Sequence, residues 1–164
     1  MNRKKVLQLF IIIICFAALM LANTVSPSDV QSNDCTFYVG LENTTSESLV
    51  SLWVINEDEL HQYTTNTVSM ASLRLETEEI QEIQSMSVFF EGNEIMLSDF
   101  SVVLDSGERL SYYPLDLLDD FEFWGVDNMK ITDDGRLFIE SQNGNITMRI
   151  PTQVCEEIDV LRKG

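Results

Sequence analysis

The chain has 164 residues and carries 27 acidic against 10 basic side chains, which gives a net charge of −17 at neutral pH. Such an acidic surface repels the phosphate backbone of nucleic acids and anionic lipid headgroups, so we expect neither as a partner. The partner that this charge favours is a cationic protein or peptide, and the alternative is an acidic surface that only keeps the protein soluble.

The first residues have the layout of an export signal. Arg3, Lys4 and Lys5 precede an apolar run over 6–22 that only Gln8 interrupts. We predict a signal peptide or an uncleaved signal anchor over residues 1–25 and a flexible tether over 26–34. The rest of the chain is then exported, secreted or periplasmic, or held outside by this one membrane segment. Removal of the three leading bases leaves 27 acids and seven bases, a net charge of −20.

Residues 35–160 are long enough for one hydrophobic core and too short for two ordinary domains. We therefore expect a single monomeric domain, followed by a tail over 161–164. Cys35 and Cys155 lie near the two ends of this domain. In an oxidising compartment two thiols make one intramolecular pair, so the sequence predicts a Cys35–Cys155 disulfide that ties these ends together.

Short runs in which every second residue is apolar dominate the domain, which is the period of a half-buried strand. The first run sets Phe37, Val39 and Leu41 on one face. The nearly continuous apolar run over 49–55 predicts a strand that is buried on both faces. One segment breaks the pattern, because Ile80 and Ile83 recur at helical spacing and predict a short helix near 78–85. The stretch over 113–125 fits a helical turn or a strand.

Turn sequences with glycine separate most of the later runs. Glycine tolerates the positive φ that a tight reversal needs, so we expect consecutive hairpins at these sites. The resulting fold class is mainly β, an antiparallel two-sheet sandwich, with a barrel as the less favoured alternative. The turns are Glu91-Gly92-Asn93, Asp105-Ser106-Gly107, Asp133-Asp134-Gly135 and Gln142-Asn143-Gly144.

The sequence lacks the constellations of the common enzymes. His61 is the only histidine, in a polar stretch that we interpret as a surface loop, and no phosphate-binding glycine loop occurs. We predict no enzyme, no catalytic residue, no cofactor and no metal. An irregular calcium site remains an alternative to simple turn chemistry, because hard cations need only several converging oxygens. Its ligands would be Asp127, Asn128, Asp133 and Asp134.

The predicted function is an exported, non-catalytic binding or accessory module for a cationic partner, and no binding residue is assigned to it. The alternative is a carbohydrate-binding sandwich that uses Trp53, Trp124, Tyr112 and Tyr113. It requires at least two of these rings on one exposed sheet face, whereas core packing is what we expect for both tryptophans. Asn43 and Asn145 stand in N-glycosylation acceptor patterns, which are used only if the source cell glycosylates exported chains.

Overall fold

The computed structural model describes residues 34–42, 47–57, 59–76, 80 and 82–163, and these residues belong to one compact unit. The predicted signal segment over 1–25 and all but the last residue of the tether over 26–34 lie outside the described residues. No described helix combines the length and the apolar character that a membrane span requires.

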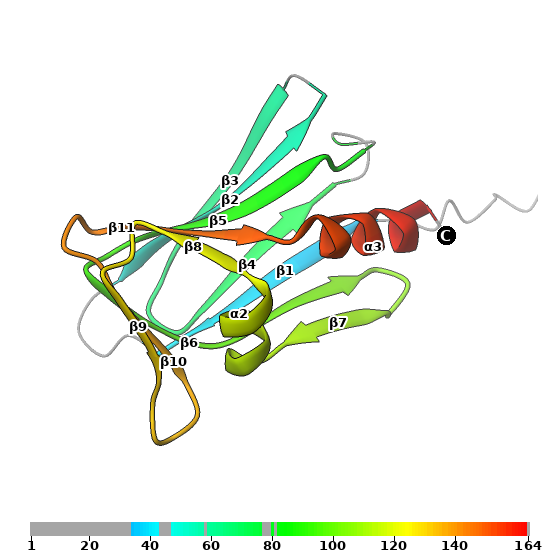
Figure 1. Cartoon of the computed structure of the whole chain (residues 1–164). Coiled ribbons are helices and arrows are strands. Elements are labelled where there is room, and N and C mark those ends of the chain that lie inside the picture. Colours follow the sequence, from blue (N-terminus) through cyan, green and yellow to red (C-terminus); the bar gives the residue numbers. More distant parts are fainter. Residues whose placement is uncertain (1–33, 43–46, 58, 77–79, 81, 164) are drawn as a thin grey trace, which may run out of the picture. The chain divides into compact units, whose positions relative to one another are not determined.

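Two antiparallel sheets pack face to face without closing into a barrel, so the predicted two-sheet β-sandwich is confirmed (Figure 1). Sheet A has the strand order β4 (Met70–Leu75), β1 (Cys35–Leu41), β6 (Glu94–Leu104), β10 (Leu137–Glu140), β9 (Asn128–Ile131), and β7 (Arg109–Tyr112) also pairs with β6. Sheet B has the order β3 (Glu59–Thr67), β2 (Ser48–Asn56), β5 (Ser85–Glu91), β11 (Asn145–Ile150), β8 (Glu122–Trp124).

The core lies between the sheets, and it is formed by the side chains that point inward at every second position along the strands. The residues that the alternation assigns to the core in three strands are all buried, as predicted. They are Phe37, Val39 and Leu41 in β1, Leu137 and Ile139 in β10, and Ile146, Met148 and Ile150 in β11. The prediction for β2 is wrong, because only one of its faces enters the core. Val50, Leu52 and Val54 point inward. On the opposite face Leu49 and Trp53 are half-buried, Ile55 is exposed and Ser51 is buried.

Only two of the four predicted hairpins are hairpins. Asp105-Ser106-Gly107 joins β6 to β7, and Asp133-Asp134-Gly135 joins β9 to β10. The other two turns carry the chain from one sheet to the other: 91–93 leads from β5 to β6, and 142–144 leads from β10 to β11. A tight turn suits both connections equally well, so turn chemistry alone does not determine which sheet the next strand joins.

The helix expected near 78–85 is wrong for the part of it that the structure describes. Ile80 and residues 82–84 are irregular, and β5 begins at Ser85; residues 77–79 and 81 lie outside the described residues. This segment crosses from β4 in sheet A to β5 in sheet B. Ile80 and Ile83 are buried along the crossing, so their spacing reflects a covered connection rather than a helix.

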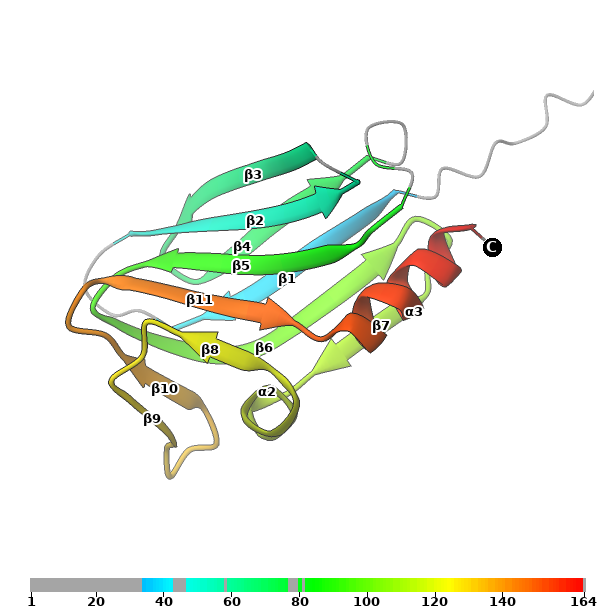
Figure 2. The same ribbon diagram turned by 45° about the horizontal axis from the view of Figure 1, so that its top comes forward.

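The two described helices lie elsewhere, at α2 (Pro114–Asp120) and α3 (Thr152–Lys163). The stretch over 113–125 thus contains both structures that its pattern allows, α2 and then strand β8 (Glu122–Trp124). Helix α3 extends over residues 161–163, which we assigned to a tail. Its buried side chains recur every three or four residues and cover one end of the sandwich (Figure 2); they are Val154, Cys155, Ile158 and Arg162.

Cys35 and Cys155 are both buried as free thiols, so the predicted disulfide is not present in this structure. Cys35 opens β1 in sheet A, whereas Cys155 lies in α3 with its Sγ 3.8 Å from the carbonyl oxygen of Ile150. The two residues thus belong to different layers at the same end of the sandwich. Burial raises the pKa of Cys35 to about 12 and that of Cys155 to about 11, because a thiolate is poorly solvated there.

Candidate ligand-binding face

The outer face of sheet B points away from the core, and no described helix or strand covers it (Figure 2). Residues directly opposite each other in an antiparallel pair share a face, so the strand register fixes the side chains that line it. These are Leu60, Gln62, Thr64 and Asn66 of β3, Leu49, Ser51, Trp53 and Ile55 of β2, Ser85, Ser87, Phe89 and Glu91 of β5, Asn145, Thr147 and Arg149 of β11, and Glu122 and Trp124 of β8.

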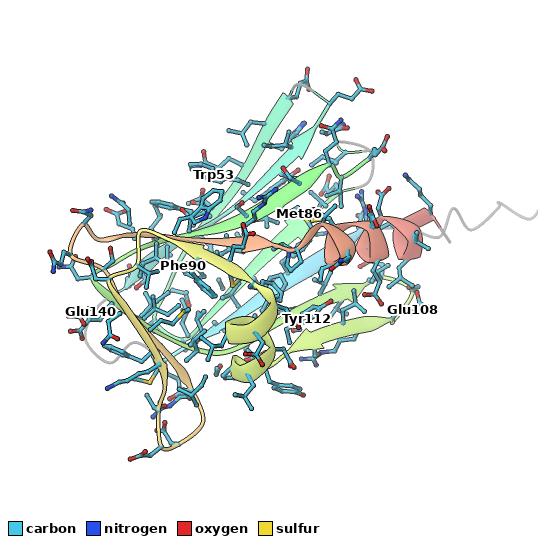
Figure 3. The ribbon with its side chains drawn as sticks, in the orientation of Figure 1. Trp53, Met86, Phe90, Glu108, Tyr112 and Glu140 are labelled. Atoms are coloured by element: carbon cyan, nitrogen blue, oxygen red, sulfur yellow. The ribbon has the colours of Figure 1, made fainter. Side chains whose placement is uncertain are left out.

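Three aromatic rings stand on this face. Trp53, which is labelled in Figure 3, stacks on Phe89 of the neighbouring strand, with ring centroids 5.6 Å apart and planes 11° apart. Trp124 on β8 is 56% exposed. Trp53 and Trp124 are separated by three strand steps, which corresponds to about 14 Å across the sheet. The face therefore carries apolar rings at two separate positions.

The expectation that both tryptophans pack in the core is wrong. Trp53 is one of the residues of β2 that point outward, and Trp124 points outward from the edge strand β8. Phe89 was missed as a candidate, although the alternation of "MSVFF" contains the signal: Val88 and Phe90 are buried and Phe89 points the other way. Tyr112 and Tyr113 do not belong to this face, because Tyr112 lies in β7 of sheet A and Tyr113 directly precedes α2.

Polar side chains surround the rings and are partly held in place. The hydroxyls of Ser51 and Thr64 are 2.9 Å apart, and Nε2 of Gln62 donates a hydrogen bond of 3.2 Å to Oγ1 of Thr64. On the far side, the Arg149 guanidinium lies 5.9 Å from the centre of the Trp124 ring, and its Nη1 lies 3.4 Å from Oε2 of Glu122. The face thus offers hydrogen-bond donors and acceptors beside each ring.

This face is nearly neutral although the protein is strongly acidic. Among its strand side chains described above, only Glu91, Glu122 and Arg149 are charged, so the acids exceed the bases by a single charge. A neutral surface attracts no ion at long range. Flat rings with neutral hydrogen-bonding neighbours suit an uncharged, polyhydroxylated ligand better than a charged one.

The buried indole nitrogen of Trp53 lowers the stability of the folded protein. Its Nε1 is buried and has no hydrogen-bond partner among the described residues. A buried donor without a partner costs about 1–3 kcal/mol. A phenylalanine would provide a similar ring without this donor, so packing against Phe89 does not by itself account for a tryptophan here.

A hollow of about 650 Å³ opens at one end of this face. It lies where the two crossing turns meet, and backbone hydrogen bonds hold these turns together: Gly92 N donates to Gly144 O at 2.9 Å, and Ser141 N donates to Asn93 O at 2.7 Å. Four of the residues that line it also belong to the outer face of sheet B. The lining consists of Glu47, Leu49, Asn66, Glu91, Gly92, Asn93, Asn143, Gly144 and Asn145.

Of the four residues of the alternative calcium site, Asp127 and Asp134 form hydrogen bonds within the protein, and Asn128 lies in strand β9. Asp127 Oδ2 accepts a hydrogen bond of 2.6 Å from Gln142 N, and Asp134 Oδ1 accepts one of 2.5 Å from the Thr132 hydroxyl. Asp134 also pairs with Arg136. Within the described residues, no group of three or more histidine, cysteine or acidic side chains is placed to hold a metal ion.

His61 lies in strand β3 and not in the surface loop that we expected. Its side chain lies on the inward face of that strand and is 24% exposed. Its Nε2 lies 3.7 Å from Oε2 of Glu59. The edge of the sheet explains the polar sequence around it, because every second residue of β3 faces water. No described cysteine or second histidine lies with it in a metal-binding group.

A second surface is strongly acidic. It comprises Asp116, Asp119 and Asp120 of α2 and Glu156 and Glu157 of α3, all of them exposed, and we call it the α2–α3 face. Tyr112 lies beside α2 (Figure 3). Its pKa is raised to about 12, mainly by burial and to a smaller extent by the negative charges of Glu157, Asp120 and Asp116. Carboxylates from both helices therefore lie near this one ring.

Comparison with known proteins does not assign this chain to a family. No family model matches the chain, and neither the curated proteins nor the solved structures include a significant match.

Proposed function

We propose that the protein is a non-catalytic carbohydrate-binding module whose ligand lies on the outer face of sheet B. The observation that carries this proposal is the placement of Trp53, Phe89 and Trp124 on one face among neutral hydrogen-bonding side chains. Of the two functions that the sequence indicates, this is the one that the arrangement of side chains supports better.

The physical basis is the match between the face and a sugar. A pyranose presents C–H groups on its ring faces and hydroxyls around its rim, so it needs a flat apolar surface with polar groups beside it. Aromatic rings provide a large contact area at a small entropic cost. Thr64 and Gln62 supply donors and acceptors on the strand next to Trp53, and Arg149 supplies donors beside Trp124. All three already form side-chain contacts that restrict their orientation, Gln62 with Thr64 and Arg149 with Glu122.

Tryptophan fluorescence tests this proposal directly, because both tryptophans of the chain lie on the proposed face. The protein is produced without residues 1–25 in a host that does not attach N-glycans, since a glycan on Asn145 would occupy the face. It is then screened against immobilised neutral glycans, and hits are titrated in solution. We expect binding that changes the tryptophan emission and protects it from acrylamide.

The matched variants are Trp124→Ala and Tyr113→Ala, which remove rings of similar exposure, 56% and 62%, on different surfaces. Trp124→Ala should weaken binding at least about tenfold, in line with about 1–3 kcal/mol for a lost stacking contact, and Tyr113→Ala should not. Binding to no glycan, or equal loss in both variants, would refute the proposed function.

The place of action in this proposal is outside the cytoplasm. The support is the basic, then apolar layout of residues 1–22. The intact mass of the natively exported chain reports whether residues 1–25 are removed. Recovery of the whole chain from the cytosol would contradict this part of the proposal.

A second candidate function is the capture of a cationic protein or peptide, and the α2–α3 face is the observation that favours it. Carboxylates from two helices lie around Tyr112, and Leu115 and Tyr113 are exposed beside them at 63% and 62%. Charge pairing accelerates encounter, and such exposed apolar groups add contact area once the partner is bound.

A pull-down at low and at high salt tests this second function. The variant Asp116→Asn/Asp120→Asn/Glu157→Gln should lose the capture that the unmodified protein shows at low salt. An equal number of neutralised acids on the β9–β10 hairpin and its surroundings, Asp133→Asn/Asp134→Asn/Glu140→Gln, provides the control. Capture that ignores both salt and the variants would rule the α2–α3 face out.

A further inference from the structure

We infer that the ligand is a neutral, linear oligosaccharide rather than a single sugar, and that the hollow at the crossing turns is a subsite for one residue of the same chain. This inference rests on the proposed function and names the ligand class of that site. It assigns a role to the amide side chains of Asn66, Asn143 and Asn145, which the ring contacts alone leave unused.

The spacing of the contact points supports a chain. Trp53 and Trp124 lie about 14 Å apart across three strand steps, and Trp53 lies about 13 Å along β2 from Leu49, which borders the hollow. A single pyranose ring spans neither gap. A ligand that contacts both tryptophans and the hollow must therefore extend over several linked sugars.

The hollow is contiguous with the rings. Trp124 is opposite Thr147, and Asn145 follows on the same face two residues along β11. The hollow's volume of about 650 Å³ lies within the range of about 300–1,000 Å³ that small-ligand pockets occupy. The outer face of sheet B thus runs without interruption from Thr147, beside Trp124, to Asn145 at the hollow, and a chain of several sugars can follow it.

The side chains of the hollow are suited to hydroxyl recognition. A carboxamide offers both a donor and an acceptor, as a sugar hydroxyl does. The turns that carry Asn93 and Asn143 are fixed to each other by two backbone hydrogen bonds, so these groups do not have to be ordered when the ligand binds. Such preorganisation reduces the entropic cost of binding.

Charge restricts the class of sugar. Glu47 and Glu91 line the hollow, and the whole chain carries −17. An acidic sugar would be repelled, whereas a neutral one is not. The occupant that fits the rings, the amides and the charge together is a chain of neutral sugars.

Titration with defined oligomers tests this inference. The probes are oligomers of one to six residues of β-1,4-linked glucose and of β-1,4-linked N-acetylglucosamine, together with an oligouronate of similar length. For the series that binds, we expect the affinity to rise at least tenfold between the single sugar and the chain that reaches both tryptophans. The oligouronate should not bind.

The variant Asn66→Ala/Asn143→Ala separates the hollow from the rings. Both side chains are exposed, and Asn128→Ala on β9 is the control for removal of an exposed amide. The double variant should keep the affinity for the shortest oligomer that binds and lose at least about fivefold for the longest, and Asn128→Ala should change neither. Equal affinity for all lengths, with binding still lost in Trp124→Ala, would overturn this inference and leave the proposed function standing. Failure of every oligomer and every neutral glycan to bind would overturn both.

Discussion

The two ends of the sandwich differ in almost every physical respect. At one end, α3 covers a dry interior in which Cys35, Cys155 and Arg162 are buried. At the other end, the crossing turns surround an open hollow that is lined mainly by amides and carboxylates. The first end is held by burial and by one strong polar contact, whereas the second is held by backbone hydrogen bonds between turns.

This difference indicates a division of roles. The buried side chains at the closed end contact one another and are out of reach of a ligand, so their chemistry serves stability. Side chains at the open end face water, and loss of an exposed polar group usually costs little stability. Substitutions at the two ends should therefore have opposite profiles, with stability affected at one end and binding at the other.

The thiols give the largest expected effect. A pKa raised from about 9 to about 12 lowers the thiolate fraction of Cys35 about a thousandfold at pH 8. Alkylation of Cys35 in the native protein should therefore be at least about a thousandfold slower than in denaturant. In denaturant without reductant, both thiols should react; reaction of neither would mean that the two are joined in a disulfide.

The same pKa values give the sign of a pH dependence. Below about pH 8 both thiols are largely protonated in the folded and unfolded states and contribute almost no slope. As pH rises from 9 towards 11 for Cys155 and 12 for Cys35, the unfolded chain loses the protons first, so the folded state loses stability. Urea unfolding of Cys35→Ala should show a shallower decline over this range than the unmodified protein, and an unchanged slope would contradict the assignment.

Arg162 gives the next largest effect. Its side chain is 2% exposed, its Nη2 donates a hydrogen bond of 2.7 Å to the carbonyl oxygen of Ile80, and Nη1 lies 4.0 Å from Oδ1 of Asp159. Removal of one partner from a buried charged pair costs about 3–5 kcal/mol, so Arg162→Ala should lower the free energy of unfolding by about 3 kcal/mol. Lys163→Ala, at an exposed neighbour, should change it by less than about 0.5 kcal/mol. Equal effects would contradict a buried anchor.

Much of the fold follows from the sequence because burial in a strand has a period of two. Phe37 and Val39, and likewise Ile146 and Met148, are assigned to the core by local alternation, and the structure buries them. The local sequence does not determine which sheet each strand joins. The glycine turn after Asp105 leads to a hairpin partner in the same sheet, whereas a similar turn after Glu91 leads to a strand in the other sheet. That choice depends on pairing between distant strands.

The candidate site was harder to predict for a related reason. Trp53 lies in a run that is apolar on both faces, so its outward direction becomes clear only from the pairing of β2 with β3 and β5. In the sequence, Asn93 and Asn143 each indicate only a turn. They come together in space because the chain passes from one sheet to the other at both turns, which the local sequence does not reveal. Helix α3, in contrast, was within reach, because Val154, Ile158 and Leu161 stand at helical spacing after Pro151.

Gly144 tests how the open end is held. Its φ is +67°, and a Cβ there would lie 2.8 Å from Oδ1 of Asn93. Gly144→Ala should cost about 1–2 kcal/mol, because an L-residue is disfavoured in this conformation, and should also displace the Asn93 carboxamide. Gly135→Ala is the control, since φ is +82° there and nothing lies within 4 Å of the added carbon. Equal destabilisation with ligand affinity reduced only in Gly144→Ala is the expected result; equal affinity would mean that Asn93 takes no part in the hollow.

The smallest effect on stability is expected from the amides of the open end. Asn66 and Asn143 are exposed, and water can replace any hydrogen bond that their side chains lose, so Asn66→Ala and Asn143→Ala should each change the free energy of unfolding by less than about 0.5 kcal/mol. Chemical denaturation monitored by circular dichroism provides the measurement, with Arg162→Ala as the destabilised reference. A loss above about 1 kcal/mol in either amide variant would mean that the hollow is built by stabilising turn contacts, and the contrast between a structural end and a binding end would then fail.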